Sequence, residues 1–312
     1  MKSAALRDPS PDGLELFVSH WLPDAETRAT LQIVHGMGEH SGRYARLAER
    51  CCAAGFEVFA ADTRGHGRSL VAPDLLGHLA DHDGWTKAVE DVGRLAARIA
   101  AERPGVPHAL LGHSMGSLLV LDRLGRGALP VDAVVLSGTS GPPGRGIALA
   151  LWTARFERLR LGVRGQSALL QKMLFGRFND AFAPAETDFD WLSRDRAEVA
   201  KYVADPRCGF VLRVGGLCDL AGALRGIFAP EALARIPREL PLAVISGECD
   251  PVHDGKRGLE ALGAALRAAG LTRLRERVYD GARHELLNET NREQVTSELL
   301  DWLEESLAQR GG

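Results

Sequence analysis

Short apolar runs alternate with longer helical patterns along most of this chain, and that alternation restricts the fold more than any other feature of the sequence. The apolar runs are too short for helices and are bounded by Gly or Pro, so they are predicted as buried strands. These strands are expected at residues 14–21, 31–35, 56–61, 108–111, 131–137, 241–246 and 273–279. The helical patterns occupy residues 44–54, 86–103, 114–126, 255–269 and 291–307. The alternation predicts an α/β fold whose mostly parallel central sheet carries helices on both faces.

The alternation is interrupted once, after the strand predicted at residues 131–137. A loop rich in Gly and Pro follows at residues 138–146, and from there to about residue 235 the pattern is helical without a convincing strand. An insertion at this point of an open α/β sheet would lie over the carboxyl ends of the strands, where such sheets bind their ligands. We therefore expect a core made of residues 1–140 and 236–312, with a helical cap at residues 141–235.

Composition excludes several classes of function. The 312 residues carry 38 Lys and Arg against 41 Asp and Glu, a net charge of −3, whereas a nucleic-acid-binding domain is expected to be strongly basic. Five cysteines, of which Cys51 and Cys52 are adjacent and the other three scattered, fit neither a disulfide framework nor a zinc site, so we expect reduced thiols and no metal. No apolar run approaches the roughly 18 residues of a membrane span, and none near the N-terminus has the length of a signal peptide. These features predict a cytoplasmic protein.

The sequence Gly112-His113-Ser114-Met115-Gly116 is the most specific motif in the chain. It follows a predicted buried strand and opens a predicted helix, which is the context of a nucleophile elbow. A sharp turn from strand to helix strains its central residue, and the flanking glycines leave room for the chain to pass. The turn would raise the Ser114 hydroxyl above the sheet and aim the Met115 N–H at an oxyanion. The plainer alternative, a glycine-rich turn with a surface serine, would not require this context.

A serine hydroxyl is a weak nucleophile, and it needs a neighbouring base that a third group orients. In this architecture the chain order is Ser, then an acid, then His, each on a loop after a strand. Only His253 and His284 lie downstream of Ser114, and His284 alone follows a predicted strand of its own. We therefore predict His284 as the base and interpret His253 as a loop histidine.

The acid is expected on the loop after the strand at residues 241–246. Asp250 is well placed there to hold the imidazole tautomer, although an aspartate before Pro251 is also an ordinary turn residue. Glu248 and Asp254 are weaker candidates on the same loop. The sequence thus predicts Asp250 as the acid of a Ser-His-Asp triad.

The second oxyanion donor is expected from the turn after the strand at residues 31–35. In that turn Gly36 and Gly38 flank Met37, and glycines allow the backbone to fold close to the nucleophile. The N–H of Met37 is therefore the candidate donor.

The same stretch supports a rival from another functional class. Glycines at 36 and 38, followed by a helix and a strand ending at Asp62, are similar to a dinucleotide-binding unit whose acidic residue holds the ribose. However, Ser41 stands where the third glycine belongs, and Glu39 would meet the pyrophosphate where an anion is disfavoured. We therefore disfavour NAD(P) binding and expect no cofactor.

Several motifs taken together are similar to those of the α/β-hydrolase fold. They are residues 35–44, residues 62–69, residues 112–116, Asp250 and residues 282–285. The branch that they resemble is the monoacylglycerol lipase and lysophospholipase group, also labelled serine aminopeptidase-like. The resemblance follows the whole chain in order and is densest outside the cap. It implies a mostly parallel sheet with a helical cap inserted after the sixth strand.

By the same resemblance Ser114, Asp250 and His284 match the catalytic triad, and Met37 and Met115 match the oxyanion donors. One departure is Ser117, where many relatives have a second glycine, and it is expected to change helix packing more than chemistry. Epoxide hydrolases and haloalkane dehalogenases share the fold but use an aspartate at the elbow. The serine at position 114 therefore argues against both.

The cap is where substrate choice is expected. Residues 147–152 and Phe156 form an apolar helical stretch. We predict that Trp152, Phe156, Trp191 and Phe210 bind the substrate, although the same residues could simply pack the cap.

The first part of the cap is also locally basic. Between residues 145 and 177 seven Lys and Arg stand against one acid, Glu157. An apolar face beside basic residues suits peripheral contact with a membrane or micelle, or the entry of an acyl chain. A solvated amphipathic helix has the same pattern, so that interpretation stays open.

These features predict a serine hydrolase that cleaves carboxylic esters through an acyl-enzyme and needs neither cofactor nor metal. The resemblance implies monoacylglycerols or related single-chain lipid esters as substrates. Lysophospholipids and small esters are alternative substrates. A dinucleotide-dependent oxidoreductase and a catalytically silent binding protein on this fold are the alternatives outside ester hydrolysis.

Overall fold

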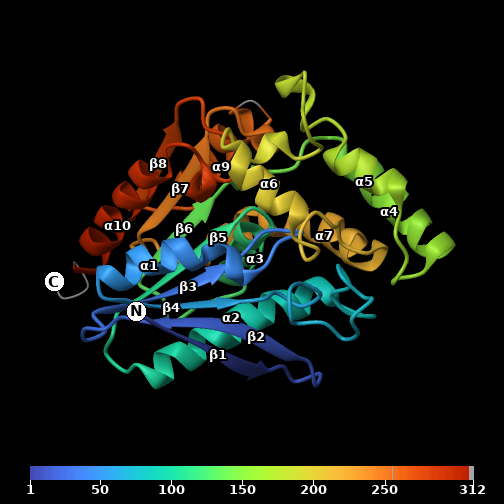
Figure 1. The fold of residues 1–312 in the computed structure, drawn as a ribbon. Coiled ribbons are helices and arrows are strands. Elements are labelled where there is room, and N and C mark those ends of the chain that lie inside the picture. The colour runs from blue at the N-terminus through green and yellow to red at the C-terminus, as the bar shows by residue number, and fades with distance from the viewer. Residues whose placement is uncertain (255, 309–312) are drawn as a thin grey trace.

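One mixed sheet of eight strands forms the centre of the computed structural model, which describes residues 1–254 and 256–308 (Figure 1). The strands are β1 (Lys2–Pro9), β2 (Glu15–Leu22), β3 (Ala29–Val34), β4 (Phe56–Ala61), β5 (His108–His113), β6 (Ala133–Ser137), β7 (Leu242–Gly247) and β8 (Leu274–Tyr279). Their order in the sheet is β1-β2-β4-β3-β5-β6-β7-β8. The β1–β2 and β2–β4 pairs are antiparallel, and every other pair is parallel. The predicted mostly parallel sheet is confirmed.

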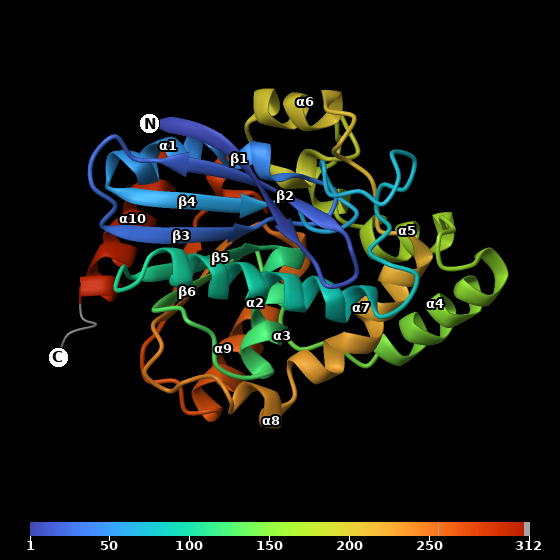
Figure 2. The same ribbon diagram turned by 90° about the horizontal axis from the view of Figure 1, so that it is seen from below.

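Helices cover both faces of this sheet (Figures 1 and 2). Helices α1 (Ala45–Ala53) and α10 (Arg292–Ala308) lie on one face. Helices α2 (Gly84–Glu102), α3 (Met115–Gly125) and α9 (Arg257–Ala268) lie on the other. In β5, Leu111 packs with α1 and α10, whereas Leu110 packs with α2 and α3. Because the central strands are buried on both faces, they appear in the sequence as continuous apolar runs.

The sequence analysis did not predict strand β1. It pairs only with β2 at the edge of the sheet, and Asp8 is its one buried residue. An edge strand exposed along most of its length has no apolar pattern, so a search for buried runs misses it.

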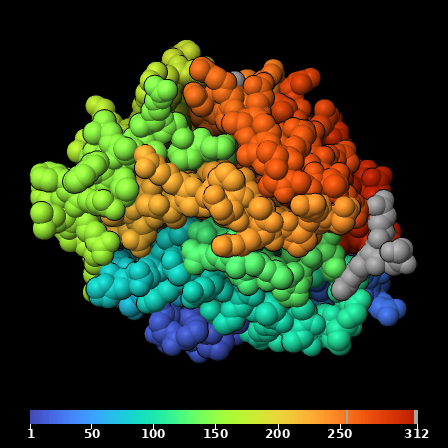
Figure 3. All heavy atoms as spheres, turned by 180° about the vertical axis from the view of Figure 1, so that it is seen from behind, coloured from blue at the N-terminus to red at the C-terminus, as the bar shows by residue number. Residues whose placement is uncertain are grey.

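The segment between β6 and β7, residues 138–241, contains helices without a strand, and we call it the cap segment. Its helices are α4 (Ile147–Leu161), α5 (Ala168–Phe175), α6 (Arg196–Ala204), α7 (Val214–Ile227) and α8 (Pro230–Leu233). The space-filling view from behind shows the part around α4 and α5 projecting at one end of the molecule (Figure 3). Among the described helices, none combines the length and the apolar character that crossing a bilayer requires.

Candidate active site

Ser114 occupies the turn between β5 and α3 with φ 52° and ψ −121°, a conformation that a residue with a side chain rarely adopts. Its backbone N–H donates to the carbonyl of Ser137 on the neighbouring strand, at 2.8 Å. A Cβ added at Gly116 would lie 2.1 Å from the Val34 carbonyl oxygen, and one at Gly112 would lie 2.6 Å from the Gly116 carbonyl oxygen. The two glycines therefore make the strained turn possible, as the sequence predicts.

His284 and Asp250 come together at the ends of neighbouring strands. The Nδ1 of His284, after β8, lies 2.8 Å from Oδ2 of Asp250, after β7, and both side chains are buried. Because a carboxylate can only accept, Nδ1 carries the proton and donates it. The other carboxylate oxygen accepts the N–H of Val252 at 2.9 Å. Asp250 thus fixes the tautomer of His284 and leaves Nε2 unprotonated.

Burial is the largest single influence on the pKa of each member of this pair, but the surrounding charges and hydrogen bonds together outweigh it. Burial alone would lower the pKa of His284, but Asp250, with Glu285 and Glu39, raises that pKa above its ordinary value. For Asp250, burial alone would raise the pKa, and His284 together with the Val252 N–H holds it below its ordinary value. The pair is therefore suited to hold a proton on the imidazole when a reaction delivers one.

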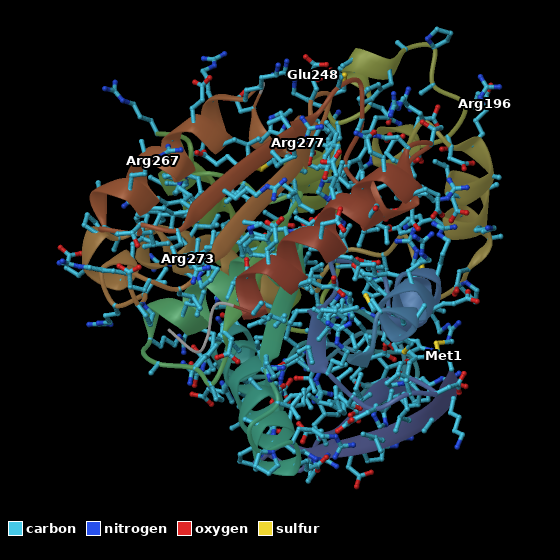
Figure 4. The ribbon with its side chains drawn as sticks, turned by 90° about the vertical axis from the view of Figure 1, so that its left-hand side faces the viewer. Met1, Arg196, Glu248, Arg267, Arg273 and Arg277 are labelled. Carbon is cyan, nitrogen blue, oxygen red and sulfur yellow. The ribbon has the colours of Figure 1, made fainter. Side chains whose placement is uncertain are left out.

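The weaker candidates for acid and base are occupied elsewhere. His253 is buried, with Nε2 at 2.8 Å from the Gly247 carbonyl and Nδ1 accepting the Lys256 N–H at 2.9 Å. Glu248 accepts from Lys256 Nζ at 2.9 Å and lies at the surface of the loop after β7 (Figure 4). Of the acids considered on this loop, Asp250 alone hydrogen-bonds to His284 among the described contacts.

Met37 and Met115 face the same cavity as Ser114. Met37 lies in the turn after β3, and Met115 is the first residue of α3. Within the described part of the chain, the N–H groups of Met37 and Met115 have no recorded acceptor. The loop of Met37 is held close by a hydrogen bond of 3.0 Å from the Gly209 N–H of the cap segment to the Gly38 carbonyl.

A buried cluster of charges that the sequence analysis missed lies beside these loops. The guanidinium of Arg43 pairs with both oxygens of Glu285 at 2.5 and 2.6 Å and with Glu39 at 2.9 Å. Glu39 in turn accepts the Gly36 N–H at 2.6 Å. Burial alone would raise the pKa of Glu39, but Arg43 and the other groups around the carboxylate, including the Gly36 N–H, together lower that pKa to about 2. Arg43 therefore ties the loop of Met37 to the loop of His284.

A cavity of about 760 Å³ connects these groups to the cap segment, and its walls are mostly apolar. Trp191 and Phe210, both predicted to bind substrate, line it, and the Trp191 ring lies 4.9 Å from the ring of His284. Residues of α5 form the cap side of the cavity, including Leu174 and Phe175.

The structure corrects the prediction for Trp152 and Phe156. Neither lines the cavity, and they are 70% and 62% exposed. Both lie on α4, whose buried residues are Ala154 and Glu157, so the helix turns its aromatic side chains outward. Apolar residues at helical spacing indicate that a helix has an apolar face, but they do not indicate which part of the protein packs against that face.

The residues suggested for dinucleotide binding have structural partners. Asp62 accepts the Ser41 N–H at 2.8 Å and the Arg68 N–H at 2.7 Å, one on each oxygen. Glu39 is buried under Arg43. The site thus offers no free carboxylate for a ribose, which argues against the oxidoreductase alternative.

His40, Asp205 and Cys208 form the one group of potential metal ligands found among the described residues. However, Nδ1 of His40 accepts the Gly42 N–H at 3.1 Å, so Nε2 carries the proton and donates to Asp205 at 3.0 Å. Ligating a metal through Nε2 would place a protonated Nδ1 against the Gly42 N–H. The group is therefore better suited to a hydrogen bond between the cap segment and the loop of Met37.

Known proteins are similar to this chain in sequence. The family described as serine aminopeptidase, S33, matches residues 25–291. A monoacylglycerol lipase of Mycolicibacterium smegmatis is 30% identical, over 93% of this chain and 93% of its own, and human monoglyceride lipase is 29% identical, over 96% and 90%.

Solved structures are similar to this chain in fold. A thermostable carboxyl esterase from Bacillus coagulans, in complex with glycerol, superposes with a TM-score of 0.89 at 25% identity, covering 98% of this chain and 99% of its own. A monoacylglycerol lipase from Paleococcus ferrophilus shares the fold, with a TM-score of 0.68 at 23% identity over 94% and 100% of the two chains. This chain therefore has the α/β-hydrolase fold and belongs to the serine aminopeptidase S33 family.

Proposed function

We propose that this chain hydrolyses monoacylglycerols through an acyl-enzyme formed on Ser114. The observation that carries the proposal is a serine on a strained turn that opens into the same apolar cavity as a buried His284–Asp250 pair. Relatives named as monoacylglycerol and monoglyceride lipases, similar over nearly the whole chain, support the choice of ester.

In the first half of the reaction, Oγ of Ser114 attacks the ester carbonyl carbon while Nε2 of His284 takes the hydroxyl proton. Asp250 stabilises the imidazolium through Nδ1. The negative charge that forms on the carbonyl oxygen is held by the N–H groups of Met37 and Met115. When the tetrahedral intermediate collapses, the imidazolium gives its proton to the leaving alcohol, and the acyl group stays on Ser114.

In the second half, a water molecule attacks the acyl-enzyme, and His284 takes one of its protons. The intermediate collapses, Ser114 recovers its proton from His284, and the fatty acid leaves. His284 passes on each proton that it accepts within the same half-reaction, so the enzyme ends the cycle in its starting protonation state.

The mostly apolar cavity supports an acyl-chain site rather than a site for small polar esters. Each CH₂ that moves from water into such a wall contributes up to about 0.8 kcal/mol, which is nearly fourfold in kcat/KM. We expect kcat/KM to rise along a series of 1-monoacylglycerols from short to medium chains, measured below their micelle concentrations, and then to level off.

Comparison with other substrates and with a covalent probe distinguishes the alternative functions. Equal turnover of acetate and octanoate esters would replace the lipase assignment with a small-ester carboxylesterase. Faster turnover of lysophospholipids than of monoacylglycerols of equal chain length would replace it with a lysophospholipase. If a fluorophosphonate probe does not label the wild-type protein, the assignment of ester hydrolysis is refuted.

We also propose that the cap segment docks on the lipid aggregate that holds the substrate. Its outer side carries exposed apolar side chains, which we call the apolar cap face: Leu149, Trp152, Phe156, Leu159, Leu169 and Met173. The first four recur at helical spacing along one side of α4. An exposed apolar stripe of this kind beside cationic side chains suits the interface of a bilayer or micelle.

Charge supports a weak preference for anionic lipid. Four of the seven basic residues at 145–177 form ion pairs, whereas within the described residues none is recorded for Arg145, Arg155 or Lys172. We expect sedimentation with vesicles containing phosphatidylglycerol and weaker sedimentation with phosphatidylcholine vesicles. The double variant Trp152→Ser, Leu159→Ser should lose most of this binding and keep its turnover of monomeric p-nitrophenyl butyrate. Unchanged vesicle binding in that variant would contradict the docking.

A further inference from the structure

His35 lies at the end of β3, directly before the loop that carries Met37. Its ring is 1% exposed. Both ring nitrogens contact backbone groups: Nδ1 lies 2.7 Å from the carbonyl oxygen of Gly36, and Nε2 lies 2.9 Å from the backbone nitrogen of Thr63. Thr63 follows β4, the strand that pairs with β3, so two neighbouring strand ends hold the ring.

These two contacts fix the tautomer of His35. A backbone N–H can only donate, so Nε2 must accept the hydrogen of Thr63 and cannot carry a proton. A carbonyl can only accept, so Nδ1 must carry the proton and donate it to Gly36. The neutral Nδ1–H form satisfies both contacts, and a doubly protonated ring would set two hydrogens against each other at Thr63.

The Gly36 carbonyl belongs to the same peptide group as the N–H of Met37. In a trans peptide the C=O and the N–H point in opposite directions, so fixing one fixes the other. The hydrogen bond from His35 therefore sets the rotation of the peptide that presents the Met37 N–H to the cavity. Glu39 holds the other side of Gly36 by accepting its N–H at 2.6 Å.

We propose that His35 is a positioning residue for the reaction, which orients the Met37 N–H toward the oxyanion by holding the Gly36 carbonyl through Nδ1–H. The inference rests on the proposed function, because it assigns a cause to one of that reaction's hydrogen-bond donors. A preoriented donor stabilises the transition state more than the bound ester, since the charge on the oxygen develops only as the bond forms. Loss of the orientation therefore lowers kcat and leaves KM nearly unchanged.

Two substitutions separate the two contacts of the ring. In His35→Asn, the amide nitrogen can occupy the place of Nδ1 and donate to Gly36, while the contact with Thr63 is lost. In His35→Gln, the amide oxygen can occupy the place of Nε2 and accept from Thr63, while the donor to Gly36 is lost. We expect kcat for p-nitrophenyl butyrate to fall about 10- to 100-fold in His35→Gln and to stay within about fivefold in His35→Asn.

Inhibition by a trifluoromethyl ketone gives a second readout, because its adduct with Ser114 carries the oxyanion. The inhibition constant should weaken in His35→Gln by the same factor as kcat/KM, and hardly change in His35→Asn. The control is His108→Gln, which replaces another buried histidine at the far end of β5, where its ring contacts Thr30. This control should lower the melting temperature and keep kcat.

Equal losses of kcat in His35→Asn and His35→Gln, or losses that follow the melting temperature across all three variants, would overturn the proposal. So would full activity in His35→Gln. Inactivity of the wild type toward both ester and fluorophosphonate would instead refute the proposed function, so the two failures are distinguishable.

Discussion

Helices α3 and α4 are both rich in apolar residues but have opposite surroundings. Nine of the eleven residues of α3 are buried, whereas Ala154 and Glu157 are the buried residues among the fifteen of α4. Helix α3 begins at the Ser114 turn and packs between the sheet, α2 and α7, whereas α4 contacts mainly α7 and α5. Burial in this chain therefore depends on position in the fold and not on apolarity alone. Helix α3, which begins at the Ser114 turn, is enclosed, whereas α4 faces outward and leaves its apolar side chains exposed.

The same contrast holds for charges. Beside the site, Glu39 and Glu285 are buried and both pair with Arg43, whose side chain is only slightly exposed. On the cap segment, Arg155 is exposed and has no ion pair recorded among the described residues. Changes near the site should therefore have large effects, and equivalent changes on α4 should have small ones.

The largest effect is expected from the groups that we place in the triad. Ser114→Ala and His284→Ala should each lower kcat for p-nitrophenyl butyrate by about 10⁶-fold, and the double variant should be little worse, because the groups act as one unit. Asp250→Asn should cost about 10⁴-fold by favouring the wrong tautomer of His284. His253→Ala is the control, and it should retain activity in the folded protein. Loss of turnover in His253→Ala together with near-normal turnover in His284→Ala would refute the assignment of the base.

The next effect concerns stability. Arg43→Met leaves Glu39 and Glu285 buried without their cation, so the free energy of unfolding should fall by about 3–5 kcal/mol. Arg155→Met, the matched change on α4, should alter it by less than about 0.5 kcal/mol. Urea denaturation followed by circular dichroism measures both. Similar losses of unfolding free energy in the two variants would contradict the difference that we infer between enclosed and exposed charges.

Two leucines test the same contrast for packing. Leu119 in α3 is fully buried, and Leu159 in α4 is 87% exposed. Leu119→Ala should lower the free energy of unfolding by about 2–5 kcal/mol, because it removes contacts and leaves a cavity. Leu159→Ala should change it by less than about 0.5 kcal/mol. A loss above about 1 kcal/mol in Leu159→Ala would mean that α4 is covered in solution, by a second copy of the chain or by another arrangement of the cap segment.

The smallest effect is a shift in pH dependence. A base must be neutral to accept a proton, and the Asp250 carboxylate favours the protonated form of His284 and raises its pKa. The acid limb of kcat/KM should therefore have its midpoint above the ordinary value of 6.5, and activity should fall as pH falls through it. In the residual activity of Asp250→Asn the midpoint should move to lower pH, whereas Leu159→Ala should leave it in place. A midpoint that does not move in Asp250→Asn would contradict the electrostatic role of the carboxylate.

Local sequence patterns predict much of this site. The strained turn at Ser114 depends on Gly112 and Gly116, which stand two residues away on either side, so the motif contains its own geometric requirement. Asp250 and His284 could be proposed because loops after parallel strands converge at one edge of the sheet. The residues that connect the loops could not be proposed in this way. Arg43 meets Glu285 across 242 positions of the chain, and no local pattern indicates such a pair.

In the cap segment, the direction in which side chains point could not be predicted from the sequence. Helical periodicity indicates that Trp152 and Phe156 share a face, but the direction of that face depends on how α4 packs on α7. Trp191 lies in a 3-10 helix of three residues and Phe210 in an irregular segment, and both are too short to give a periodic signal. They reach the cavity because the chain around them is held near the site: the His284 N–H bonds to the Trp191 carbonyl, and the Gly209 N–H to the Gly38 carbonyl. Long-range backbone contacts of this kind are visible only in three dimensions.

The central claim, that the enclosed turn at position 114 carries a nucleophile activated by His284, is tested most directly by covalent labelling. The purified protein is treated with a fluorophosphonate, digested, and the modified residue is located by mass spectrometry. We predict one modification, on Ser114, that is absent from Ser114→Ala and strongly slowed in His284→Ala, while Leu159→Ala is labelled at the wild-type rate. Labelling at another residue, or no labelling of a protein that is folded by circular dichroism, would contradict the account.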